Sequence, residues 1–119
     1  YSYVRENPIY VNKKGASDTK IVRVACSTKE TRIELEVEAD SRNDGYSIKG
    51  TTYIKGNKGG KLHLEGVENI TVTPANTYIP WPFMKLRFAL IFPALPDNAT
   101  EFDLIEPSTD WQFKDIKCR

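Results

Sequence analysis

The chain has 119 residues, of which 39% are hydrophobic. This length suits one domain with its own core, and the modest apolar fraction favours two thin layers of sheet in which one face of each strand meets water. Its 17 basic and 16 acidic residues are interleaved and give a net charge of +1, which argues against a nucleic-acid-binding protein. No apolar run reaches the roughly 20 residues that a membrane-spanning helix requires.

Residues 1–18 show little periodicity and contain turn sequences at Asn7-Pro8 and at 12–15. We predict an extended N-terminal arm over this segment, with a short strand at Ile9–Val11. A single β-sandwich domain is expected over residues 19–119.

The next two stretches are rich in β-branched residues and predict a hairpin over 20–27 and 31–39. In the second stretch the two kinds of side chain alternate: Ile33, Leu35 and Val37 against Glu34, Glu36 and Glu38. A helix would spread the glutamates around its circumference, so this pattern predicts a strand with one buried and one solvated face. The three residues at 28–30 predict a tight turn.

The rest of the chain predicts further short strands. We expect one over 46–55 with a bend at Gly50, one over 61–64, and one over 67–73 with Val67, Ile70 and Val72 buried. Residues 74–82 predict a loop, and 83–92, the most apolar stretch, a central strand. Two more strands, over 101–106 and 111–117, close the chain. About seven or eight short strands without helical periodicity predict an all-β, antiparallel sandwich or barrel.

Aromatic residues in the proline-rich loop are the best candidates for an exposed binding site. Tyr78 and Trp81 lie among prolines that would stiffen the loop and could hold aromatic faces outward, as sugar or protein contacts require. The interpretation we prefer is that Trp81 folds over the end of the sandwich as a hydrophobic plug. In the alternative, Trp81 and Tyr78 are exposed and Tyr46 and Tyr53 add further stacking surfaces.

Other segments with polar residues or glycines have simpler explanations than catalysis or ligand binding. The single histidine, His63, has no nucleophile or acid near it in the sequence and is expected on the solvent face of a strand. The glutamate row at 34, 36 and 38 could be drawn as a cation site, but a solvated sheet face with cross-strand lysines is the preferred interpretation. The glycine-rich segment at 56–60 is followed by a strand rather than a helix, so it predicts a hairpin turn and not a phosphate loop. We therefore expect no enzyme, no metal and no cofactor.

Two cysteines, Cys26 and Cys118, match no zinc or redox spacing. Their wide separation permits a disulfide between an early strand and the last one. Two buried thiols are the alternative, and the one we prefer.

Several stretches of the chain resemble a known family. The last third contains LIFPALP at 90–96, ATEFDLIE at 99–106 and WQFKDI at 111–116, and the first half has an Asn-Pro near its start, the TRIELEVE hairpin strand and a TYI strand. Together they resemble a β-sandwich module of secreted or lipid-anchored proteins of the Bacteroidetes, which in some relatives precedes a thioredoxin-like domain. The resemblance implies an immunoglobulin-like sandwich outside the cytoplasm, whether periplasmic, secreted or lipid-anchored at the outer membrane. It supplies no catalytic residues.

From these observations we expect a non-enzymatic interaction or accessory module of a bacterial envelope protein, with a leader or another segment upstream of Tyr1. Its partner would be a protein or glycan of the cell envelope. The alternative is a dedicated glycan-binding module that uses its exposed aromatic residues, and a hydrolase is the third and least favoured hypothesis.

Overall fold

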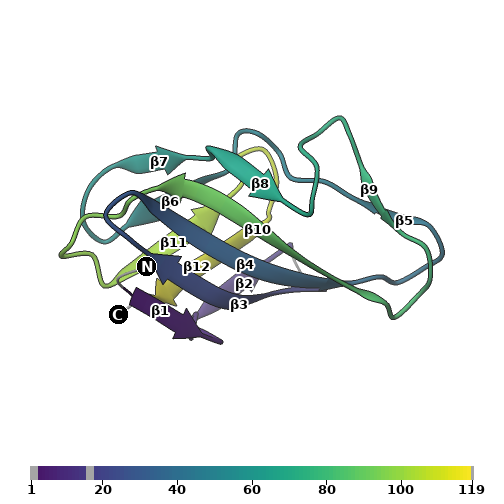
Figure 1. Ribbon diagram of the computed structural model, residues 1–119, viewed down its shortest axis with the longest axis horizontal. Helices are drawn as coiled ribbons and strands as arrows, with labels where there is room; N and C mark the ends of the chain where they lie inside the picture. The colour runs from purple at the N-terminus through teal and green to yellow at the C-terminus, as the bar shows by residue number, and fades with distance from the viewer. Residues whose placement is uncertain (1–2, 16–17, 119) are drawn as a thin grey trace.

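The computed structural model describes residues 3–15 and 18–118 (Figure 1). Strands and turns make up these residues, and no helix occurs among them, so none that could cross a membrane. The strands are β1 (Tyr3–Glu6), β2 (Asn12–Lys14), β3 (Thr19–Cys26), β4 (Glu30–Glu38), β5 (Asp44–Tyr46), β6 (Tyr53–Gly56), β7 (Lys61–His63), β8 (Gly66–Glu68), β9 (Thr77–Ile79), β10 (Lys85–Pro93), β11 (Glu101–Ile105) and β12 (Gln112–Lys117).

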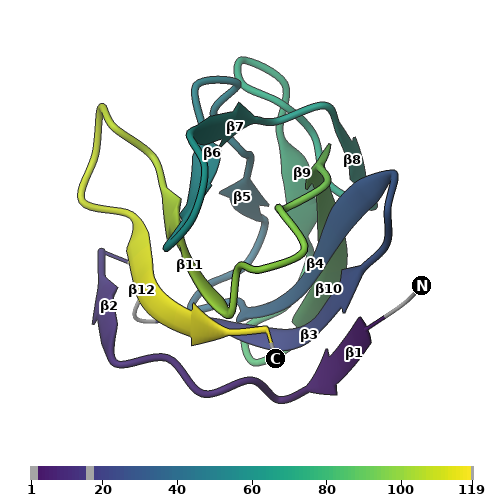
Figure 2. The ribbon, with the colours of Figure 1, turned by 90° about the vertical axis from the view of Figure 1, so that its left-hand side faces the viewer.

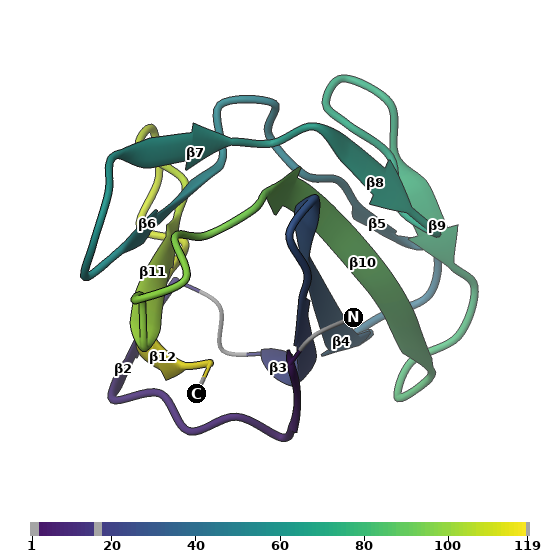
Figure 3. The same ribbon diagram turned by 60° about the vertical axis from the view of Figure 1, so that its left-hand side comes forward.

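Two antiparallel five-stranded sheets form the body of the protein. The first sheet has the order β1-β3-β4-β10-β8, the second the order β2-β12-β11-β6-β7, and β5 with β9 forms a separate two-stranded ribbon. Figure 2 shows the two sheets on opposite sides of a common interior, with the N-terminal segment passing from β1 to β2 along one open side. On the other open side β7 leads directly into β8 (Figure 3). The predicted all-β, antiparallel two-sheet fold is confirmed.

Alternating side chains build the core between the sheets. In β4 every second residue is buried, including Ile33, Leu35 and Val37, as the sequence pattern predicted. β11 contributes Phe102 and Leu104 from the opposite sheet in the same way. The expected hairpin turn is also present, because the amide of Ser27 donates to the carbonyl of Glu30.

The region predicted as one bent strand over 46–55 is divided between two sheets. β5 pairs with β9 in the ribbon, whereas β6 pairs with β7 and β11 in the second sheet. Between them the amide of Ile48 donates to Thr71 and its carbonyl accepts from Thr73, so residue 48 bridges to another part of the chain. The predicted strand over 67–73 likewise shortens to β8, with Ile70 buried, Val67 half-buried and Val72 exposed.

Two other expectations need correction, and a third is confirmed. The segment 74–82 was predicted as a loop, but it contains β9, which is short enough to escape a periodicity argument. The strand expected at Ile9–Val11 lies instead at β2, where it pairs with β12. The apolar stretch that was predicted as a central strand is β10, which pairs with β4 on one side and with β8 on the other, so this prediction is confirmed.

The molecule is elongated, with principal extents of 43 × 25 × 24 Å. The ribbon of β5 and β9 projects at one end of the long axis, and both chain ends lie toward the other (Figure 1). The ribbon and the turn that follows it are therefore the part of the fold that reaches furthest from the termini.

Candidate functional site

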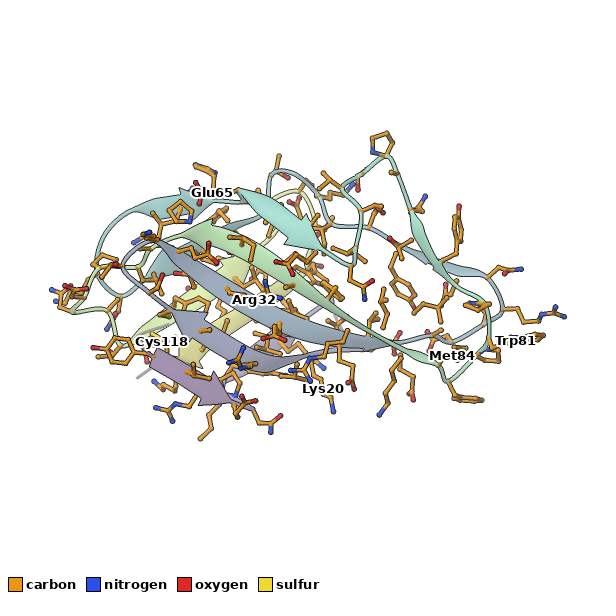
Figure 4. The ribbon with its side chains drawn as sticks, viewed as in Figure 1. Lys20, Arg32, Glu65, Trp81, Met84 and Cys118 are labelled. Atoms are coloured by element: carbon orange, nitrogen blue, oxygen red, sulfur yellow. The ribbon has the colours of Figure 1, made fainter. Side chains whose placement is uncertain are left out.

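Large apolar side chains gather on the β9–β10 connection and the end of the ribbon. The exposed fractions are 63% for Tyr78, 53% for Trp81, 77% for Phe83 and 45% for Met84. We call these four residues the aromatic tip; Figure 4 shows Trp81 and Met84 together at the end of the long axis. Singly exposed apolar residues are ordinary, whereas several large ones exposed within residues 78–84 make this segment a candidate interaction surface.

The backbone holds the tip in an unusual conformation. Phe83 has a φ of 66°, a left-handed value that is rare for a bulky residue. Its amide donates to the carbonyl of Ala39 at 2.8 Å, and the amide of Ala39 donates to Met84 at 2.9 Å. These two bonds fix the turn on the end of β4 and direct the ring of Phe83 into solvent.

Trp81 does not act as the plug that we preferred from the sequence. Half of its surface is exposed, and it is not part of the hydrophobic core cluster. The guanidinium of Arg42 lies 4.6 Å from the centre of its ring, close enough for a cation–π interaction. The end of the sandwich is closed without it, by residues such as Ile79, which is 4% exposed.

The other two tyrosines of the predicted platform lie elsewhere or are occupied. Tyr46 is half-buried against the core and donates its hydroxyl to Asp44 at 2.7 Å. Burial and this carboxylate both raise the pKa of Tyr46. Tyr53 belongs to the second sheet, where the ammonium of Lys61 lies 4.7 Å from its ring centre. Of the four predicted residues, the structure thus brings only Tyr78 and Trp81 to the exposed tip.

An acidic group lies at the base of the ribbon. A hydrogen bond with Asp18 and the negative charges of Asp18, Asp44 and Glu38 raise the pKa of Asp40. The pKa of Asp44 is lowered instead, first by its bond from Tyr46. Across the described residues, no set of three or more acidic, histidine or cysteine side chains has the arrangement of a metal site.

The glutamate row of β4 is tied into ion pairs on the outer face of the first sheet. Glu34, whose side chain is 16% exposed, accepts from Arg23 at 2.8 Å, and Arg87 approaches it at 3.3 Å. Burial acts to raise the pKa of Glu34, but these neighbouring guanidiniums outweigh it, so the pKa is lowered. Glu36 lies within 4 Å of lysines on both neighbouring strands. The face is thus a cross-strand charge network in which arginines as well as the expected lysines take part.

A pocket that the sequence analysis did not predict lies between two loops. Its volume is about 280 Å³, and its walls are the β5–β6 connection and the β11–β12 loop. The lining residues are Gly15, Ser47, Ile48, Lys49, Thr52, Glu106, Thr109, Asp110 and Trp111. We call it the Trp111 pocket.

Glu106 joins the two walls of the Trp111 pocket. It is 3% exposed, and its carboxylate accepts from the amide of Ser108 at 2.7 Å, from the Ser108 hydroxyl and from the hydroxyl of Thr51 on the other wall. Burial acts to raise its pKa, but these bonds and the charge of Lys49 lower it below the ordinary value. The sequence did contain a signal for this residue. Phe102, Leu104 and Glu106 are spaced two residues apart, so they fall on the same buried face of the strand pattern.

His63 and the two cysteines lie away from the aromatic tip and the Trp111 pocket. His63 is exposed at the end of β7 beside Tyr53, with 6.3 Å between the ring centres, as a strand histidine is expected to be. Cys26 and Cys118 are both buried and line one small pocket with Leu95 and Ala99. The disulfide between Cys26 and Cys118 stays a prediction, as does the alternative of two buried thiols.

Comparison with protein-family models, with curated proteins and with solved structures gives no match.

Proposed function

We propose that the protein is a non-enzymatic interaction module of a bacterial envelope protein, and that it contacts a protein partner through the aromatic tip. The observation that carries the proposal is the placement of Phe83. Its ring is 77% exposed although its backbone has a φ of 66°. An L-residue in this left-handed region costs roughly 1–2 kcal/mol, so the turn maintains an unfavourable conformation that presents an aromatic ring to solvent.

The position of the tip also supports this proposal. It lies at the end of the molecule remote from both chain ends, so a partner could approach it without meeting whatever is joined to the termini (Figures 1 and 4). Protein interfaces are enriched in aromatic residues, methionine and arginine. The tip contains aromatic residues and a methionine, and Arg42 lies beside Trp81.

The immunoglobulin-like class and the extracytoplasmic setting belong to the same proposal. The support for the class is the pattern of crossings, since the chain passes between the two antiparallel sheets from β1 to β2, from β2 to β3, from β4 to β6, from β7 to β8 and from β10 to β11. The support for the extracytoplasmic setting is the resemblance of residues 90–116 to envelope modules of the Bacteroidetes.

Site-specific photo-crosslinking in the cells from which the gene comes tests the tip directly. A photo-reactive phenylalanine analogue at position 83 should give discrete adducts with an envelope protein. The matched control places the analogue at Lys58, an exposed residue in the β6–β7 turn at the opposite end. Adducts that are absent at position 83, or identical from both positions, would contradict the proposal.

A second candidate function is glycan binding at the same tip, which the exposure of Tyr78 and Trp81 favours. Acrylamide quenching of tryptophan fluorescence in a Trp111→Phe protein reports Trp81 alone. A bound glycan should protect Trp81 from acrylamide. If no member of a glycan panel reduces quenching, and Trp81→Ala changes no glycan interaction, this second function is excluded.

A further inference from the structure

We infer that the Trp111 pocket binds a neutral saccharide unit, at a site that shares no residue with the aromatic tip. This inference goes beyond the proposed protein contact and does not depend on it. The argument rests on the rigidity of the pocket, on its apolar wall, on its charges and on its size.

Hydrogen bonds within each wall make the pocket preformed. In the β5–β6 connection the hydroxyl of Thr52 donates to the carbonyl of Lys49 at 2.6 Å, closing a tight turn. In the β11–β12 loop the amide of Trp111 donates to the hydroxyl of Thr109 at 3.2 Å, and the amide of Glu106 donates to the Trp111 carbonyl at 3.0 Å. Glu106 then links the two walls through Thr51. A preformed site loses little conformational entropy when a ligand binds.

Gly15 fixes the outer loop from a third direction. A Cβ atom on this residue would lie 2.8 Å from the carbonyl carbon and oxygen of Asp110, so the backbone of the loop packs directly on the glycine. The φ of Gly15 is 65°, which a glycine adopts without strain. The position of Trp111 therefore depends on a close backbone contact as well as on its own loop.

Trp111 and Ile48 supply an apolar wall. The indole packs edge to face against Phe113, with 5.1 Å between the ring centres and an angle of 82° between the planes. This contact holds the indole, which is itself half-buried, in one orientation. A held aromatic ring with a partly open surface suits the flat, C–H-bearing face of a sugar ring.

The charges around the pocket disfavour an anionic ligand. Lys49 is the one cation among the lining residues, and Glu106 and Asp110 are both acidic. A phosphate or carboxylate would meet net negative charge, and a cation would meet Lys49. Hydroxyl groups both donate and accept, so a sugar can bond to Asp110 as a donor and to Lys49 as an acceptor, with Ser47 and Thr109 adding hydroxyls of their own.

The size of the pocket limits the ligand. Its volume of about 280 Å³ lies just below the roughly 300–1,000 Å³ found for small-molecule sites. A monosaccharide, or the terminal unit of a longer glycan, is the saccharide that suits this volume. An extended chain of sugars would have to leave the pocket.

Fluorescence of Trp111 gives a direct test. The chain has two tryptophans, so Trp81→Phe leaves Trp111 as the only one. We would titrate this variant with glucose, galactose, mannose and N-acetylglucosamine, and with glycerol as a polyol that lacks a ring. At least one sugar should change the emission of Trp111 saturably, with a Kd in the millimolar range or tighter, and glycerol should not. The inference is overturned if no sugar gives a saturable change, or if glycerol gives the same one.

A pair of variants locates the binding site. Asp110→Asn, in the same Trp81→Phe background, removes a charged acceptor and should weaken sugar binding about tenfold. The matched control is Asp97→Asn, an exposed aspartate in the β10–β11 connection that does not line the Trp111 pocket. Equal binding by the two variants would refute the assignment. Because Phe83→Gly changes only the tip, it should leave sugar binding intact, so failure of the protein contact and failure of this site are distinguishable.

Discussion

Replacing Glu106 by Gln removes a negative charge from the Trp111 pocket while keeping the shape of the side chain. The native carboxylate accepts three hydrogen bonds, two from Ser108 and one from Thr51. A hydrogen bond to a charged group contributes roughly 1 kcal/mol more than a neutral one, which gives about 3 kcal/mol for three. The neutral amide recovers part of this, because it avoids the cost of burying a charge. We therefore expect E106Q to lower the free energy of unfolding by about 1–2 kcal/mol near neutral pH.

The pKa of Glu106 makes this difference depend on pH. Burial acts to raise that pKa, but the hydrogen bonds from Ser108 and Thr51 outweigh it, so the pKa in the folded state lies below the ordinary value of 4.5. Such a carboxyl stabilises the fold above its unfolded pKa, and the contribution is lost as the pH falls through the folded pKa. The difference between the native protein and E106Q should therefore shrink as the pH is lowered from about 7 to about 3.

Urea unfolding followed by far-ultraviolet circular dichroism, over a series of pH values, measures this difference. The matched control is Glu65→Gln, an exposed glutamate between β7 and β8, labelled in Figure 4. It should change the free energy of unfolding by less than about 0.5 kcal/mol. An E106Q protein as stable as the native one at neutral pH, or a difference that is the same at every pH, would refute the reasoning.

Three further substitutions test the core, the charge network and the tip. Phe102→Ala should cost about 3–5 kcal/mol in urea unfolding, because the residue is 1% exposed; a loss below about 1 kcal/mol would place Phe102 outside the core. Glu34→Gln should cost about 1–2 kcal/mol through its weakened bond from Arg23, and less in 1 M salt, which screens charges; an effect that is unchanged by salt would contradict the ion-pair explanation. Phe83→Gly should leave stability unchanged or raise it by up to about 1 kcal/mol, because it relieves the left-handed backbone; a lower melting temperature would show that the ring packs on the fold.

The sequence predicted strands and their buried residues best where a strand has one solvent-exposed face and one buried face. In β4 the alternation of aliphatic residues with glutamates determined which side chains are buried, since period two leaves no other arrangement that hides all three of Ile33, Leu35 and Val37. β3, β10, β11 and β12 were found within two residues of their expected bounds for the same reason.

Prediction failed where pairing partners are distant in the chain. The local sequence predicts that Ile48 belongs to the same strand as residue 54. In the structure its backbone instead forms hydrogen bonds with Thr71 and Thr73. Trp81 has a large aromatic side chain of the kind often found in a core. Only the tertiary structure shows that Ile79 is the buried residue of this segment and that Trp81 is exposed. The Trp111 pocket required the juxtaposition of residues 47–52 with 106–111, which no local pattern reports.

The segment over residues 3–14 supplies one outermost strand to each five-stranded sheet. β1 pairs with β3 and β2 with β12, and without these partners β3 and β12 would present rows of unpaired amides and carbonyls to other molecules. A protease that cut between β1 and β2 would leave β1 attached to its sheet only by backbone hydrogen bonds. Cleavage there, followed by release of β1, would expose the edge of β3 to pairing with other molecules.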